Sequence, residues 1–196
     1  MKRTALVAIA LCVATFGLAA CSSGSGESIS QQANKGDDKN YIAGDGTVVQ
    51  LASSDRGKPV LLTGKLLDGQ PWSSADYAGK IIVVNAWGSW CPPCQAEMPQ
   101  LEAAWKQFQK QGNIVMIGVD LNEGPQTAAA YLESVGVTYP SLQSDGGKAL
   151  LELQNKATAT PSTLVLDSQH RIAARVAGAT TESTLLGLVQ DAEGSK

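Results

Sequence analysis

The cysteine pair at positions 91 and 94 is the part of the sequence best suited to chemistry. It reads Trp-Cys-Pro-Pro-Cys over residues 90–94 and directly follows a β-branched run, 81–87, that predicts a buried strand. Residues 93–111 predict a helix, so the motif lies at a helix start. Unpaired N–H groups and a partial positive charge there stabilise a thiolate, the nucleophile of disulfide exchange. The spacing therefore predicts a redox pair.

The remaining cysteines and the one histidine restrict other chemistry. Cys12 lies in a predicted signal peptide and Cys21 at its end, so Cys91 and Cys94 alone remain for the folded region. A zinc site needs a second pair of ligands, which the sequence does not provide. We therefore expect no metal and no cofactor beyond the redox-active disulfide. A structural disulfide, which would close only a short ring, and two inert buried cysteines are the alternatives.

The first twenty residues predict a signal peptide. Lys2 and Arg3 precede an uncharged run, Ala5 to Ala20, that is too short for a comfortable membrane span. The run ends in Leu-Ala-Ala-Cys at 18–21, which resembles the lipobox of bacterial lipoproteins. That resemblance implies cleavage before Cys21, lipid on its thiol, and an extracytoplasmic protein anchored to the bacterial cell membrane. The alternative is an ordinary secretory signal with an incidental cysteine.

The rest of the chain divides into a tether, 21–44, and one domain, 45–196. Gly, Ser, Gln, Asn and Asp dominate the tether, so it cannot bury enough apolar area to offset the entropy of ordering. A coil of this length reaches roughly 25–30 Å. The chain has 196 residues, is 43% hydrophobic and has a net charge of −3, which suits one domain with a core. The negative charge argues against a nucleic-acid partner.

The folded region alternates strands and helices. We expect strands at 47–51, 60–67, 81–87, 114–119, 162–166 and 171–176, and helices at 93–111, 126–135, 148–154 and 182–192. This order predicts an α/β fold in which helices flank a central mixed β-sheet.

A longer stretch around the cysteines resembles the active-site segment of the TlpA/ResA family of membrane-tethered, thioredoxin-like proteins. It runs from Val84 to Cys94 and continues with Glu97, Met98 and Pro99, and a second similar stretch runs from Ala159 to Thr163. The resemblance implies a thioredoxin-like fold with an N-terminal β-hairpin and an inserted strand–helix element. The runs at 47–67 and 125–142 are the expected additions.

The resemblance also implies an activity and its partners. Members of this family exchange thiols and disulfides with partner proteins outside the cytoplasm, often as reductants, as in cytochrome c maturation. Apocytochrome c or another secreted protein is therefore the expected substrate, and a membrane redox protein the expected recycling partner. We expect a monomer. Thioredoxin-fold proteins range from reductants to oxidants, and the Pro-Pro pair with Glu97 favours a reductant.

Residue roles follow from matching the family motif. Cys91 is expected to be the attacking, more exposed thiol and Cys94 the resolving thiol. Trp90 is expected to contact substrate beside Cys91, together with Pro92 and Pro93 between the cysteines.

Thr160 and Pro161 resemble the family's cis-proline loop, which lies across from the sulfurs. There the backbone before the proline is free to pair with an extended substrate strand. Trp87 is expected in the core, and His170 in a turn.

Glu97 is the candidate proton carrier. Ordinary thioredoxins have a buried Asp six residues before the first cysteine, and this position is Asn85, which cannot titrate. Glu97 follows Cys94 by three residues and returns to the same helix face. A partly buried carboxylate there can exchange a proton with the resolving thiol and raise thiol pKa values by like-charge repulsion. A solvated helix glutamate is the alternative.

Two other function classes remain open. A thiol peroxidase of peroxiredoxin type shares the fold, but such enzymes have a Thr-x-x-Cys motif and a supporting Arg. Here Ser89 and Trp90 precede Cys91, and no basic residue is close in sequence. A metal or haem chaperone that binds through the reduced cysteine pair is the other class, and it would show metal-coupled loss of thiol reactivity with little turnover.

Overall fold

The computed structural model describes residues 42–194, so the predicted signal peptide and the tether up to residue 41 lie outside it. The strands are β1 (Ile42–Ala43), β2 (Thr47–Gln50), β3 (Thr63–Lys65), β4 (Pro71–Ser73), β5 (Ile81–Trp87), β6 (Ile114–Asp120), β7 (Ser141–Leu142), β8 (Ala159–Thr160), β9 (Ser162–Leu166) and β10 (Ile172–Ala177). The helices are α2 (Pro92–Gln111), α3 (Pro125–Val135), α4 (Lys148–Glu152) and α5 (Glu182–Gly194), with 3₁₀ turns η1 (Ser53–Asp55) and η2 (Ser74–Tyr77).

A six-stranded mixed sheet forms the centre, in the order β2-β10-β9-β5-β6-β7. β5 runs parallel to β6 and antiparallel to β9, and every residue of β5 and β6 is buried. Continuous β-branched runs behave this way when both faces of a strand are covered. The sequence-based expectation of a central mixed sheet is confirmed.

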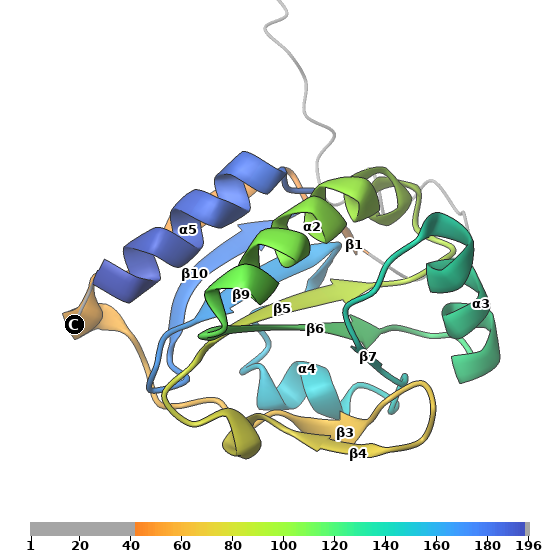
Figure 1. Cartoon of the computed structure of the whole chain (residues 1–196), viewed down its shortest axis with the longest axis horizontal. Coiled ribbons are helices and arrows are strands. Elements are labelled where there is room, and N and C mark those ends of the chain that lie inside the picture. Colours follow the sequence, from red (N-terminus) through yellow and green to blue (C-terminus); the bar gives the residue numbers. More distant parts are fainter. Residues whose placement is uncertain (1–41, 195–196) are drawn as a thin grey trace, which may run out of the picture.

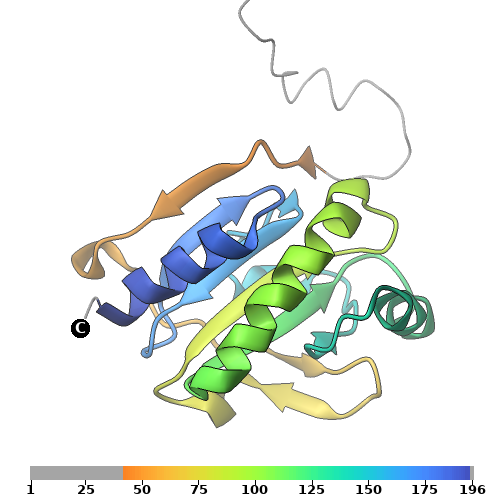
Figure 2. The same cartoon turned by 45° about the horizontal axis from the view of Figure 1, so that its top comes forward.

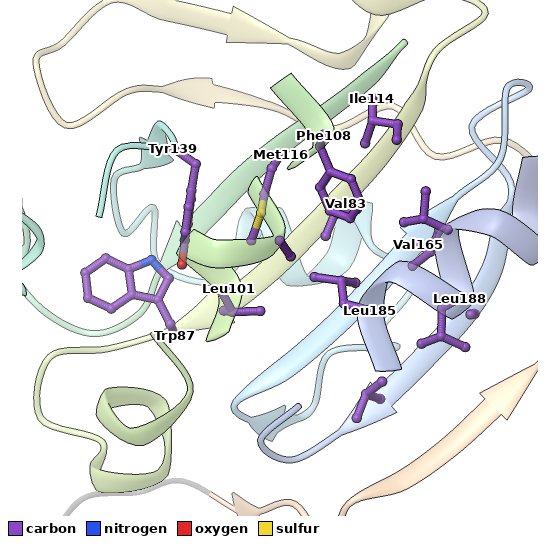
Figure 3. Packing of buried hydrophobic residues seen from close by; sticks show 14 of the residues in the cluster. Val83, Trp87, Leu101, Phe108, Ile114, Met116, Tyr139, Val165, Leu185 and Leu188 are labelled. Atoms are coloured by element: carbon purple, nitrogen blue, oxygen red, sulfur yellow. The ribbon is translucent and has the colours of Figure 1, made fainter. Parts of the chain in front are cut away.

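Helices cover the sheet on both faces. Figure 1 shows α2 and α5 on one face, and α4 with the β3–β4 hairpin on the other. Figure 3 shows Val83, Phe108 and Leu185 among the side chains that fill the layer beneath α2 and α5. Burial of such side chains is the main stabilising term of the fold, at roughly 1.5–3 kcal/mol for each. The core therefore holds β5 and α2, between which the cysteine motif lies, in a fixed relation.

The N-terminal strands pair differently from the sequence-based expectation. The runs at 47–51 and 60–67 do not pair with each other: β2 joins the edge of the main sheet beside β10, and β3 pairs with β4. Asp68 and Gly69 provide the turn chemistry for β3–β4, since Gly69 has φ of +88° and Asp68 accepts the N–H of Gln70.

Arg56 lies in the segment that connects those two runs. It is buried, and its guanidinium lies 3.0 Å from the Asp167 carboxylate at the end of β9. A buried ion pair of this kind fixes where the chain passes, so residues 53–59 cross between sheets instead of reversing.

The insertion at 125–142 adds a helix and an edge strand. It forms α3 and then β7, and β7 pairs parallel with β6. No helix within residues 42–194 is long and apolar enough to cross a membrane.

Candidate active site

The two cysteines lie where β5 ends and α2 begins. Cys91 is the N-cap residue of α2 and Pro92 is its first residue. This position suits proline, because the backbone N–H that proline lacks would have no partner within the helix. Cys91 and Cys94 are joined in a disulfide, with Cα atoms 5.2 Å apart. The N–H of Cys94 donates to Sγ of Cys91 at 3.3 Å. After reduction, the same N–H and the helix terminus stabilise a thiolate on Cys91.

The cysteines are less accessible than the family motif suggests. Cys91 and Cys94 both have 0% of their surface exposed, so the expectation of a more exposed Cys91 is wrong for this disulfide form. Trp90 and Pro93 are half-buried and Pro92 is exposed, so the residues around the pair form the accessible rim.

The predicted cis-proline loop is present and already has a backbone partner. The bond between Thr160 and Pro161 is cis, as expected, and both residues are buried. β1 pairs in parallel with β8, so that Ile42 lies opposite Ala159 and Ala43 opposite Thr160. Figures 1 and 2 show β1 beside the N-terminal end of α2, where the cysteines lie. The edge that the resemblance assigns to substrate is therefore occupied by the chain's own strand.

A close glycine contact brings β1 to this position. A Cβ on Gly44 would lie 2.2 Å from the backbone nitrogen of Gly178, and one on Gly178 would lie 2.8 Å from that of Gly46. Gly178 itself donates its N–H to the carbonyl of Pro161. The backbones can approach this closely because none of these residues has a side chain. Ile42–Gly44 fall within the stretch whose composition predicted a tether, so this strand differs from the sequence-based expectation.

Glu97 is buried and held by two hydrogen-bond donors. Only 1% of its surface is exposed, and its carboxylate accepts the side-chain amide of Asn85 and the N–H of Thr180, each at 2.9 Å. Burial raises its pKa to about 7, against the opposing effect of the two hydrogen bonds. The alternative of a solvated glutamate is wrong. A carboxyl that titrates near neutral pH, one helical turn after Cys94, can both accept and return a proton.

Glu123 was missed by the sequence analysis. Its carboxylate accepts the N–H of Ser89 at 2.6 Å and also the Ser89 hydroxyl, across 34 positions of sequence. Trp90 donates its indole N–H to the carbonyl of Leu121 at 2.8 Å. These bonds fix the loop before Cys91 against the end of β6. No local sequence signal predicts a contact of this range.

Asp120, the last residue of β6, was also missed. It is fully buried, and neither carboxylate oxygen has a hydrogen-bond partner of good geometry among residues 42–194. Burial, reinforced by the neighbouring Glu123, raises its pKa to about 8, against the opposing effect of the backbone N–H groups of Ser144 and Leu121.

Trp87 and His170 take the structural roles expected of them. Trp87 is fully buried and donates to the Ser141 hydroxyl, and Figure 3 shows it within the core cluster. His170 lies in the β9–β10 turn with a positive φ and its ring beside the carbonyl of Tyr77.

Comparison with known proteins identifies similar chains. The family profile described as "AhpC/TSA family" matches residues 60–175. The thiol:disulfide interchange protein HelX of Rhodobacter capsulatus is 36% identical over 59% of this chain and 62% of its own length. The thiol-disulfide oxidoreductase ResA of Bacillus subtilis is 27% identical over 65% of this chain and 72% of its own. The chain thus spans less than two thirds of the HelX protein.

Solved structures agree with the fold. A DsbF homologue from Corynebacterium diphtheriae aligns with a TM-score of 0.68 and 28% identity, over 77% of this chain and 96% of that one. A secreted thiol-disulfide isomerase from Corynebacterium glutamicum aligns with a TM-score of 0.70 and 25% identity, over 78% and 95%. These matches confirm the thioredoxin-like fold and the resemblance to TlpA/ResA-like proteins.

Proposed function

The chain belongs to the AhpC/TSA family, and from this membership we propose that it is an extracytoplasmic thiol–disulfide oxidoreductase that reduces disulfides in partner proteins. The observation that supports this most directly is the Cys91–Cys94 disulfide at the start of α2, with the N–H of Cys94 directed at Sγ of Cys91. Relatives named thiol-disulfide oxidoreductase support the reaction type. Apocytochrome c and other secreted proteins are the proposed substrate class, through the TlpA/ResA resemblance.

The reaction proceeds in two exchanges. The Cys91 thiolate attacks one sulfur of the partner disulfide, the partner S–S bond breaks, and its other sulfur leaves as a thiolate that takes a proton. The Cys94 thiolate then attacks Sγ of Cys91, breaks the mixed disulfide and releases the second partner thiol. Two electrons pass to the partner as the Cys91–Cys94 disulfide forms. Glu97 is the proposed acceptor of the Cys94 proton, because its carboxyl is buried one turn away.

Reduction of an insulin-type disulfide, followed with the full chain, tests this function. Turnover with a regenerating dithiol is expected, and its absence would refute the proposal. Peroxide consumption faster than disulfide exchange would favour the peroxidase class. Against that class, two of the three arginines within residues 42–194, Arg56 and Arg171, are bound to Asp167 at the far end of β9.

A metal-binding role for the cysteine pair is tested by thiol titration with and without divalent metal. No group of three or more Cys, His, Asp or Glu in residues 42–194 is arranged to hold a metal ion. We expect thiol reactivity that does not depend on metal, and a metal-coupled loss of reactivity would favour the chaperone class.

Substrate docking at the β8 edge requires displacement of β1. We expect Gly44→Val to loosen β1, because the new side chain would meet the backbone of Gly178. Loss of backbone hydrogen bonds worth about 1 kcal/mol corresponds to a roughly fivefold rise in kcat/KM for a protein disulfide.

Gly57→Val is the matched control for this prediction, since a Cβ there meets its nearest atom only at 3.7 Å. Equal kcat/KM values for the two variants and the unmodified protein would show that β1 does not compete with substrate. Thermal unfolding of each variant checks that the domain remains folded.

We further propose that lipid on Cys21 anchors the protein to the membrane and that residues 22–41 tether the domain. The mature protein would have a charge of −5, from 13 basic and 18 acidic residues after loss of Lys2 and Arg3. A lipid rather than a basic surface would therefore provide the attachment.

Cys21→Ser should abolish lipid attachment and release the protein from membranes or block its processing. Detergent partitioning of cell fractions measures the outcome. Unchanged partitioning of the variant would contradict the anchor. Cys12→Ser is the control, because the signal peptide would be removed with that residue.

A further inference from the structure

A cavity of about 190 Å³ lies at the carboxyl end of β6, beside the cis-proline segment. A water molecule's share of liquid volume is about 30 Å³, so the space suits a side-chain head group. Three segments supply its polar walls: the end of β6, the loop before α4 and the approach to Pro161, with Asp120, Asn122, Ser144, Asp145, Thr158 and Thr160. Thr160 belongs to the β8 edge, so the cavity adjoins the proposed docking strand.

Asp120 is the unusual member of this lining. It is 0% exposed, and neither carboxylate oxygen accepts a hydrogen bond of good geometry within residues 42–194. The N–H groups of Leu121 and Ser144 act on this carboxyl only enough to lower its pKa against the larger effects of burial and of Glu123. An unpartnered buried polar group costs roughly 1–3 kcal/mol, and native structures satisfy the large majority of such groups. A donor from outside this chain would remove that cost.

The charge of the cavity defines what kind of donor fits. Asp145 adds a second carboxyl, which accepts the N–H groups of Gly147 and Ala149. The described lining includes no Lys, Arg or His, while Leu121, Leu150 and Ala157 add apolar surface. An unpaired carboxyl and an apolar wall together suit a cationic head group on an apolar stem. A metal ion is less suited, because residues 42–194 hold no three-ligand cluster.

We propose that this cavity is a specificity subsite that binds a Lys or Arg side chain of the partner protein, close to the disulfide being exchanged. The inference rests on the proposed function, since the partner strand replaces β1 on the β8 edge. Successive side chains of a strand point to opposite faces. Only every second position of the partner strand can therefore direct a basic side chain toward Thr158, Thr160 and the cavity behind them.

A peptide series tests the subsite. Each extended peptide has one cysteine in a mixed disulfide with a chromophoric thiol, and Lys or Gln is placed in turn at each position from four before to four after that cysteine. The reduced full-length protein attacks the mixed disulfide, and release of the chromophore gives kcat/KM. We expect the Lys-to-Gln ratio to reach at least tenfold at one position, or at two positions separated by one residue.

Asp120→Asn should lower that ratio to near one, because the amide keeps the shape but cannot ionise to pair with a cation. Asp76→Asn removes the same charge from an exposed site and should leave the ratio unchanged. A ratio near one at every position in the unmodified protein would overturn the subsite while the exchange reaction stands. A ratio that survives Asp120→Asn, or that Asp76→Asn lowers equally, would also overturn it. No chromophore release from any peptide would instead refute the proposed function.

Discussion

Cys91→Ser is expected to abolish disulfide exchange. A hydroxyl at this position forms no mixed disulfide, so the first of the two exchanges cannot occur. The rate of insulin-type reduction should fall to that of the buffer with dithiol alone, which is the measurement. Cys91 also accepts the N–H of Cys94 as the N-cap of α2, and Ser is a favoured N-cap residue, so the helix start should persist.

Cys94→Ser should also stop turnover, but one step later than Cys91→Ser, at the mixed disulfide. The first exchange still proceeds, but the mixed disulfide lacks the thiol that resolves it and accumulates. Non-reducing electrophoresis with a disulfide partner should show the adduct, and mass spectrometry should place it on Cys91. The double variant Cys91→Ser with Cys94→Ser is the control and should form none. If Cys94→Ser turns over as fast as the unmodified protein, the assigned roles of the two thiols are wrong.

The redox pair could be predicted from sequence because its determinants are local. The run of β5, the Cys-x-x-Cys motif and the apolar repeat of α2 follow one another without interruption, and each part is specified by its own residues. The cis bond before Pro161 could be predicted only through the resemblance of 159–163 to a known family.

The remaining parts of the site depend on contacts that sequence patterns do not encode. Glu123 contacts Ser89 across 34 positions of sequence. β1 pairs with β8, and the paired residues Ile42 and Ala159 are 117 positions apart in sequence. β1 is two residues long, within a stretch of low hydrophobicity, so no periodic pattern indicates it. Its position depends on the close approach of Gly44 to Gly178, which only the folded chain shows.

Burial of Glu97 links the redox chemistry to pH. The amide of Asn85 donates to Glu97, and Asn85 takes the position where ordinary thioredoxins have a buried Asp. Glu97, with a pKa of about 7, is therefore the titrating carboxyl of this pair. Its usual pKa is 4.5. Between these values the folded protein binds more protons than the unfolded chain, so the free energy of unfolding falls as pH rises from about 4.5 to 7. A pKa shift of this size corresponds to a change of about 3 kcal/mol in the free energy of unfolding.

Glu97→Gln should remove the part of that pH dependence due to Glu97 and make the cysteine pair more oxidising. An ionised carboxylate near the sulfurs disfavours the Cys91 thiolate, and a change of one unit in pKa is about 1.4 kcal/mol. The helix N-terminus opposes it by typically 0.3–1 kcal/mol. Because the two effects are comparable, loss of the carboxylate should lower the pKa of Cys91 and stabilise the reduced form. For this two-electron couple, the reduction potential should rise by about 30 mV for each unit by which the pKa of Cys91 falls.

Glu102→Gln separates this effect from a general loss of buried charge on α2. Glu102 is also buried, but its carboxylate accepts the N–H and hydroxyl of Thr138. Thiol titration and equilibrium with glutathione, measured for both variants, should show a shift for Glu97→Gln alone. The fall in the free energy of unfolding between pH 4.5 and 7 should become smaller in the same variant, and the part due to Asp120, whose pKa is also raised, should remain. An unshifted Cys91 titration with an unchanged potential would restrict Glu97 to holding Asn85 and Thr180. The proposed reducing bias would then have to originate in the helix start and the Pro-Pro pair.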